Sequence, residues 1–156
     1  MQEVVNLLTK KNKTIATMES CTGGGVVNAI TNIEGASEIL KYSAVTYSNE
    51  YKIKMGVSSE VIAKYSVYSI EVAKEMAFNI SKFANSNYGV GITGKLNRLD
   101  INNPYGENNI TYVAIYDKDY DKYYTLTIKS TESTRALNKD LIINKIVDKL
   151  LEVIRR

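Results

Sequence analysis

The chain of 156 residues contains no histidine and no tryptophan, and it has one cysteine and one proline. Without histidine, neither a Ser-His-Asp triad nor a Cys-His pair can form within the chain. Zinc sites built on histidine or on clustered cysteines are excluded in the same way, so we expect no metal. Any nucleophilic chemistry must use lysine, tyrosine or a carboxylate as its base.

Long apolar runs are also lacking, since no segment approaches the roughly 20 residues that span a bilayer. The start, MQEVVNLLTKKN, has no cleavable apolar stretch, so we expect no signal peptide. One cysteine cannot form an internal disulfide, and these features together predict a cytoplasmic protein that does not contact membranes. The formal charge of +3, from 20 basic and 17 acidic residues, is too even for a nucleic-acid-binding face.

The hydrophobic pattern predicts one α/β domain over residues 1–156. Helical spacing of apolar residues predicts helices over about residues 2–11, over 69–83 and from about 133 onward. A further helix is predicted to follow a glycine turn and to end near residue 32. Strands are predicted near 14–18, 42–48 and 88–94, followed by a hairpin of 110–116 and 123–129. Because helices alternate with strands early and a hairpin comes late, we expect a three-layer α/β/α fold with a mixed sheet.

Particular residues refine these expected helices. Asn49 and Ser69 are predicted N-caps. Phe83 is expected on the apolar stripe of the 69–83 helix, and Leu137 on that of the last helix.

Residues 18–25, MESCTGGG, join a predicted strand to a helix through three consecutive glycines. A glycine in a helix interior costs about 1 kcal/mol relative to alanine. A strand followed by a glycine turn and a helix start can present free backbone N–H groups to an anion or an oxyanion. The alternative is tight packing of the helix on the strand. Both glycine-bearing strand ends, 20–25 and 91–94, are expected where α/β folds bind ligands.

Four residues near these ends are candidates for chemistry, and each has a second interpretation. Ser20 is either a nucleophile beside backbone donors or an ordinary N-cap. Cys21 is either a reactive thiol or, as we favour, a small buried apolar residue. Lys52 lies about one turn into the helix predicted after Tyr47 and could serve as a base if its pKa is lowered, although lysines are usually solvated. Tyr47, at the end of a predicted strand, could relay a proton or orient the pair, the alternative being an ordinary polar residue.

Four segments, in this order and spacing, resemble the CinA C-terminal domain family: TIATMESCTGGG, TYSNEYKIKMGV, YSVYSIEVAKEMA and GVGITG. That family includes the stand-alone nicotinamide mononucleotide deamidases called PncC. The resemblance covers residues 2–94 and continues more faintly through the hairpin and last helix. It implies hydrolysis of the carboxamide of nicotinamide mononucleotide to nicotinate mononucleotide and ammonia, without metal or cofactor, in a homodimer.

The same resemblance implies roles for individual residues. Ser20 would be the nucleophile, assisted by Tyr47 and Lys52. Backbone N–H groups near residues 21–24 would hold the oxyanion. The residues implied in substrate binding are Cys21, Thr22, Gly23, Gly24, Gly91, Thr93, Gly94 and Arg135.

The segment after Gly94 departs from the family pattern. Where the family typically has a proline and a glycine-rich loop, this chain has Lys95 and the polar stretch LNRLDINN, and only Pro104 and Gly106 correspond. The candidate phosphate partners are Lys95, Arg98 and Arg135, the alternative being surface charges. Two other functions stay open: a nucleotide-binding or protein-interaction module with little deamidase activity, and a hydrolase of another small amide.

Overall fold

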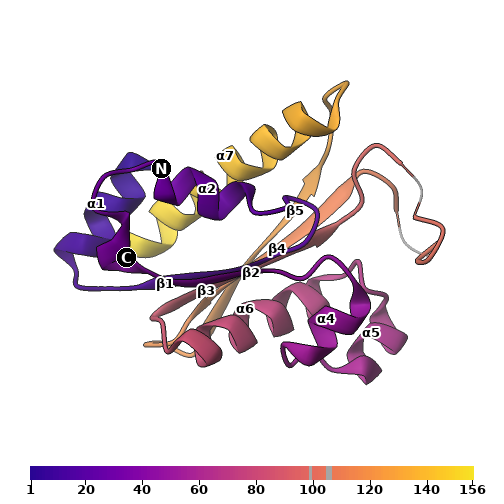
Figure 1. Cartoon of the computed structure of the whole chain (residues 1–156), viewed down its shortest axis with the longest axis horizontal. Coiled ribbons are helices and arrows are strands. Elements are labelled where there is room, and N and C mark those ends of the chain that lie inside the picture. The colour runs from indigo at the N-terminus through magenta and orange to yellow at the C-terminus, as the bar shows by residue number, and fades with distance from the viewer. Residues whose placement is uncertain (99, 105–106) are drawn as a thin grey trace.

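The computed structural model describes residues 1–98, 100–104 and 107–156, and within them one mixed sheet of five strands lies between two layers of helices (Figure 1). Gly106 lies outside the described residues. The elements follow in this order: α1 (Gln2–Lys10), β1 (Ile15–Glu19), α2 (Gly25–Thr31), α3 (Ala36–Ile39), β2 (Leu40–Val45), α4 (Asn49–Lys54), α5 (Ser59–Tyr65), α6 (Ile70–Ala84), β3 (Tyr88–Gly94), β4 (Ile110–Asp117), β5 (Lys122–Lys129) and α7 (Arg135–Ile154).

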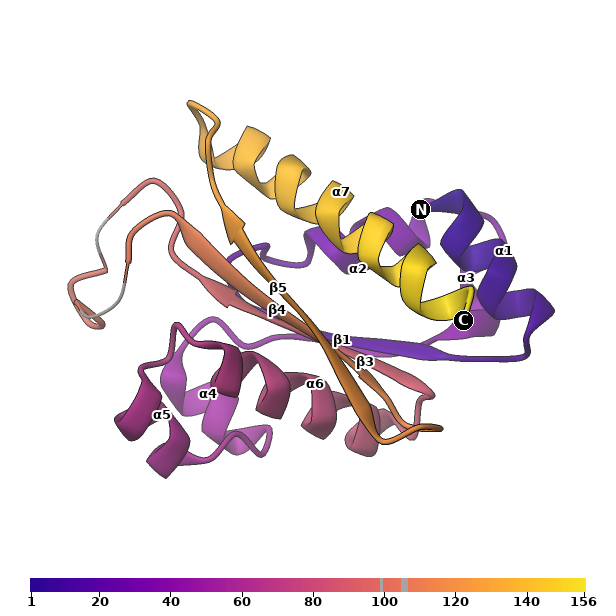
Figure 2. The same cartoon turned by 180° about the vertical axis from the view of Figure 1, so that it is seen from behind.

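The strand order in the sheet is β2-β1-β3-β4-β5. Strands β2, β1 and β3 run parallel, whereas β4 and β5 form the antiparallel hairpin. Helices α1, α2, α3 and α7 cover one face, and α4, α5 and α6 lie on the other (Figures 1 and 2). This confirms the predicted three-layer α/β/α fold with a mixed sheet. The parallel strands place the carboxyl ends of β1, β2 and β3 at one edge, where the candidate residues gather.

The strand β3 is buried along its whole length, and two of its glycines let α6 approach it closely. A Cβ on Gly91 would lie 2.2 Å from the carbonyl oxygen of Ala73 and 2.5 Å from the backbone nitrogen of Ala77. These distances are shorter than any van der Waals contact, so a side chain at this position would force the backbone of α6 to move away from the sheet. Gly91 therefore serves the packing of α6 on the sheet.

Several local predictions need correction. Ser48, not Asn49, is the N-cap of α4, because its Oγ accepts a hydrogen bond from the backbone N–H of Tyr51 at 3.3 Å. The predicted cap Ser69 is confirmed by the bond from the Val72 N–H at 3.2 Å. The strand β2 ends at Val45 rather than near 48, since the next residues lead into this cap.

Two apolar residues lie outside the core that the helical stripes predicted. Phe83 is 64% exposed and packs on the outer surface against Tyr42, with ring centroids 5.0 Å apart. Leu137, in the first turn of α7, is 47% exposed. The buried side of α7 is formed instead by Ile142, Ile146, Leu150, Val153 and Ile154. In the described part of the chain, no helix has both the length and the apolar character required to cross a membrane.

Candidate active site

Glu19, the last residue of β1, organises the glycine turn. Its carboxylate accepts hydrogen bonds from the hydroxyl of Thr22 at 2.6 Å and from the backbone N–H groups of Gly24, Val26 and Val27 at 3.2, 3.1 and 2.8 Å. The start of a helix leaves such N–H groups without partners in the helix itself. The donors that the glycine turn was expected to offer to an outside anion are therefore largely taken by the chain's own carboxylate.

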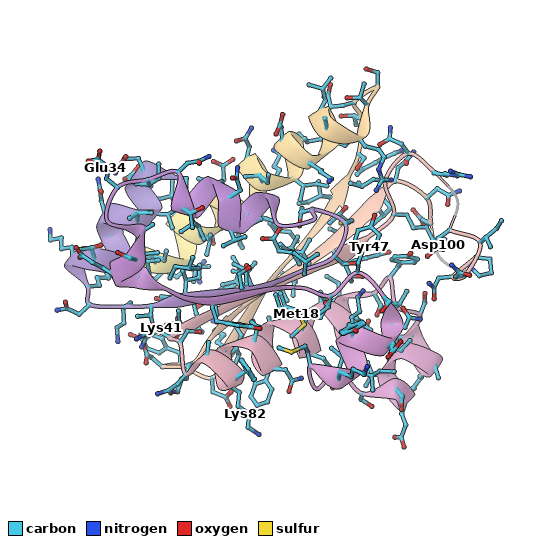
Figure 3. All side chains as sticks on the ribbon, viewed as in Figure 1. Met18, Glu34, Lys41, Tyr47, Lys82 and Asp100 are labelled. Atoms are coloured by element: carbon cyan, nitrogen blue, oxygen red, sulfur yellow. The ribbon has the colours of Figure 1, made fainter. Side chains whose placement is uncertain are left out.

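Replacing Glu19 by glutamine is expected to lower the free energy of unfolding by about 3 kcal/mol. The amide offers one acceptor oxygen where two are used, and it turns an NH₂ group toward N–H donors. In a chain of this size the melting temperature should fall by roughly 6–12 °C. Urea denaturation followed by circular dichroism measures the change. Glu34→Gln is the control, because Glu34 is exposed at the opposite end of the molecule (Figure 3); equal midpoints for both variants would contradict the role of Glu19.

Ser20 follows β1 directly and meets a buried lysine from α4. The Nζ of Lys52 donates to the Oγ of Ser20 at 3.1 Å and to the backbone carbonyl of Thr46 at 2.7 Å. Lys52 is only 2% exposed, so the solvated position that lysines usually take does not apply here. The serine and lysine that stood 32 residues apart in the sequence are thus in direct contact.

Burial lowers the pKa of Lys52 to about 8, because a charged ammonium loses its hydration in this position. The nearby carboxylate of Asp100 acts in the opposite direction, since its negative charge favours the ammonium form. A lysine with this pKa is neutral in a useful fraction at mildly basic pH. The neutral amine can accept a proton from the serine hydroxyl that it already contacts.

A cavity of about 790 Å³ opens beyond the carboxyl ends of β1 and β3, next to this pair. Figure 3 shows Tyr47 and Asp100 at this end of the molecule. The walls come from the end of β1, the segment around α4, the loop before α6, the segment after β3 and the start of α7. The lining residues are Ser20, Cys21, Tyr47, Ser48, Asn49, Glu50, Lys52, Val67, Tyr68, Gly94, Lys95, Leu96, Arg98, Asp100, Asn102, Asn103 and Arg135.

Tyr47 lies at the rim of the cavity rather than between the serine and the lysine. Its side chain is 64% exposed, and its hydroxyl accepts a hydrogen bond from Arg135 at 3.4 Å. Arg135 also donates to the backbone carbonyl of Leu96. The direct contact of Ser20 with Lys52 allows proton transfer without a tyrosine relay.

Cys21 is buried beside the nucleophile position. Its thiol is 4% exposed, and its sulfur lies 3.8 Å from the hydroxyl of Thr111. Burial raises the pKa of this thiol to about 11, which leaves almost no thiolate at neutral pH. The structure thus favours the buried apolar role of Cys21 over that of a reactive thiol.

The other residues expected to bind substrate divide into two groups. Gly94 lines the cavity together with Cys21 and Arg135. The remaining five do not line it: Thr22, Gly23, Gly24, Gly91 and Thr93. Thr22 and Gly24 bind the Glu19 carboxylate, and Gly91 packs against α6, as described above. The Thr93 hydroxyl donates to the backbone carbonyl of Val67 at 2.9 Å, and the Gly23 N–H donates to the Ser20 carbonyl at 3.0 Å. These five residues shape the framework behind the cavity.

The chain matches the CinA C-terminal domain family over residues 1–155. It belongs to this family. It is 38% identical over 163 residues, 100% of this chain, to a putative competence-damage inducible protein of Clostridium botulinum strain ATCC 19397. A protein of the same description from Thermoanaerobacter sp. strain X514 is 46% identical over 96 residues, 60% of this chain.

This CinA domain spans only 37% and 23% of the lengths of those two relatives. Its fold matches the crystal structure of a CinA superfamily protein from Klebsiella pneumoniae with a TM-score of 0.90 and 19% identity, covering 99% of this chain and 94% of that one. A CinA superfamily protein from Escherichia coli gives a TM-score of 0.87 with 23% identity, covering 97% and 87% of the two chains. At such low identity the solved structures support the fold alone.

The sequence motifs did not identify two cavity residues: Asp100, from the segment after β3 where this CinA domain departs from the family pattern, and Tyr68, from the loop before α6. The Tyr68 hydroxyl donates to the carboxylate of Asp100, and both line the cavity. Lys95 is 3% exposed, which excludes a surface position. Its Nζ donates to the carbonyl of Pro104 at 3.3 Å and lies 5.1 Å from the centre of the Tyr68 ring. Tyr68 lies within YSVYSIEVAKEMA, one of the four segments that carry the family resemblance, and this position was the sequence signal that could have marked it as a site residue.

Proposed function

We propose that this CinA domain hydrolyses the carboxamide of nicotinamide mononucleotide, releasing ammonia and nicotinate mononucleotide. The observation that carries the proposal is the contact between Ser20 and Lys52: a serine hydroxyl 3.1 Å from a buried amine, at the wall of a cavity. A hydroxyl beside a neutral amine is an arrangement for nucleophilic acyl transfer. The motifs that carry the family resemblance supply the choice of substrate.

The proposed reaction begins with neutral Lys52. As the Oγ of Ser20 attacks the amide carbon, its proton moves to Nζ, and a tetrahedral oxyanion forms. The backbone N–H of Cys21, next to the nucleophile, is the donor that we assign to this oxyanion, as in other serine hydrolases. The lysine ammonium then protonates the departing nitrogen, so ammonia leaves and an ester on Ser20 remains. Water, activated by the same amine, attacks the ester and releases the acid.

The cavity fits a ligand of this kind in size and charge. Its volume of about 790 Å³ lies within the range of small-molecule sites. Arg98 and Arg135 line it, and a guanidinium can bind a phosphate through two parallel hydrogen bonds. We assign the phosphate to Arg135, whose side chain is held in place by its bonds to Leu96 and Tyr47.

The proposal is tested by ammonia release from nicotinamide mononucleotide, measured with the wild-type protein from about pH 6 to about pH 10. Because the neutral form of Lys52 is the base, kcat/KM should be low at acidic pH, rise through an apparent pKa of about 8 and then level off. Mass spectrometry identifies the acid product. Absence of ammonia at every pH would refute the proposed substrate, and a rate that does not rise through this range would refute lysine as the base.

A further inference from the structure

The polar segment after β3 places a fixed negative charge in the cavity. The Asp100 carboxylate accepts hydrogen bonds from the Tyr68 hydroxyl, from the side-chain amide of Asn103 at 2.9 Å and from the backbone N–H of Asn102 at 3.0 Å. The bond from Tyr68 is the largest of the causes that hold the pKa of Asp100 below its usual value. Asp100 is therefore ionised at any pH at which the serine–lysine pair would work.

This charge is held by neutral groups. Among the described residues, the hydrogen-bond donors to Asp100 are a hydroxyl, an amide and a backbone N–H, and no lysine or arginine forms an ion pair with it. A carboxylate fixed by neutral donors keeps its full charge and attracts a cation that enters the cavity. A neutral ring at the same place would gain no such attraction, and an anionic ring would be repelled.

The carboxylate also lies close enough to the reacting pair to influence it. Asp100 is among the charges that raise the pKa of Lys52 against the effect of burial. The Asn49 side chain, at the start of the helix that carries Lys52, donates to Asn103 at 2.9 Å and ties the segment to that helix. A ring whose carboxamide reaches Ser20 would therefore lie in the field of Asp100.

We propose that Asp100, positioned by Tyr68, makes this site select amides on a ring with a fixed positive charge, an N-substituted pyridinium, over the same amide on an uncharged ring. The inference rests on the proposed function and adds Asp100 as the residue that makes binding depend on the charge of the ring. The cavity would then bind a zwitterionic ligand by both of its charges, with the pyridinium at Asp100 and the phosphate at Arg135.

Two ligands that differ by one hydride on the ring, and therefore in ring charge, allow a direct test. Nicotinamide mononucleotide has a pyridinium ring, and its reduced dihydropyridine form keeps the carboxamide, ribose and phosphate without that charge. Calorimetric titration uses the Ser20→Ala variant, so that no turnover occurs. We expect the oxidised form to bind about tenfold more tightly than the reduced form, since a partly solvated charge pair is discounted for screening.

Introducing Asp100→Asn into the same background should remove this preference to within about twofold, through weaker binding of the oxidised form alone. Tyr68→Phe keeps the aromatic ring and should give an intermediate preference. Asp148→Asn, on the exposed side of α7, is the matched control and should leave the preference unchanged. Circular dichroism verifies that each variant is folded.

The inference is overturned if the Ser20→Ala protein binds both forms equally, if it binds neither, or if Asp100→Asn leaves the preference intact. Binding and turnover separate this inference from the proposed function. A charge preference without ammonia release from the wild type would support the role of Asp100 and refute the deamidase. Ammonia release without a charge preference would support the deamidase and refute the role of Asp100.

Discussion

Replacing Ser20 by alanine is expected to slow ammonia release from nicotinamide mononucleotide by about 10³-fold or more. The variant removes the oxygen that forms the covalent bond. The thiol of Cys21, the next residue, is a poor replacement, because burial raises its pKa to about 11. Steady-state kinetics of ammonia release measure the loss, which should appear in kcat while the melting temperature changes little.

The control for this variant is Ser59→Ala, which removes an exposed hydroxyl from the first turn of α5. We expect it to keep the wild-type rate. If Ser20→Ala also kept that rate, the nucleophile would have to be another group, and the assignment of Ser20 would fall. An accumulated ester on Ser20 in the wild type, found by mass spectrometry after rapid quenching, would be independent support.

Replacing Lys52 by methionine is expected to reduce kcat/KM by a similar factor of about 10³. Methionine has nearly the same shape as the lysine stem, so α4 should keep its position while the base is lost. Within the described ranges, the hydrogen bonds of the buried amine go to the Ser20 hydroxyl and the Thr46 carbonyl, and its charged form is destabilised by burial. We therefore expect the variant to be at least as stable as the wild type toward urea.

Lys54→Met on the same helix is the matched control, since Lys54 is 58% exposed and pairs with Glu50 on the surface. It should change the rate by less than about twofold, because exposed ion pairs contribute little. A Lys52→Met protein that retains both the rate and its rise with pH would contradict the role of Lys52. Loss of activity together with loss of folding would show a structural role instead.

Much of the fold was predictable because its signals are local. The three glycines of residues 23–25 stand between a strand-like run and apolar residues at helical spacing, and they mark the connection from β1 to α2. Ser69 begins α6 as expected, because a capping serine acts on the N–H three residues further on. Phe83 and Leu137 were misplaced because helical spacing alone cannot show which apolar positions of a helix the rest of the fold covers.

The candidate site was predictable only in part, because its decisive contacts join distant segments. Motif order identified Ser20 and Lys52, but the burial that lowers the pKa of Lys52 depends on how α4 packs at the sheet edge. The role of Glu19 depends on the shape of the turn that it stabilises. The contact of Tyr68 with Asp100 joins residues 32 positions apart, and no local pattern predicts such a pair.

The hydrogen bond between Asn49 and Asn103 joins two parts of the site that come from different places in the fold. The proposed reactive pair comes from the end of β1 and from α4, whereas Asp100 and its neighbours belong to the connection between β3 and β4. Residues in that connection can therefore change without altering the strand and helix that hold Ser20 and Lys52. This modular arrangement lets new ligand preferences evolve, or be engineered, around an unchanged reactive pair.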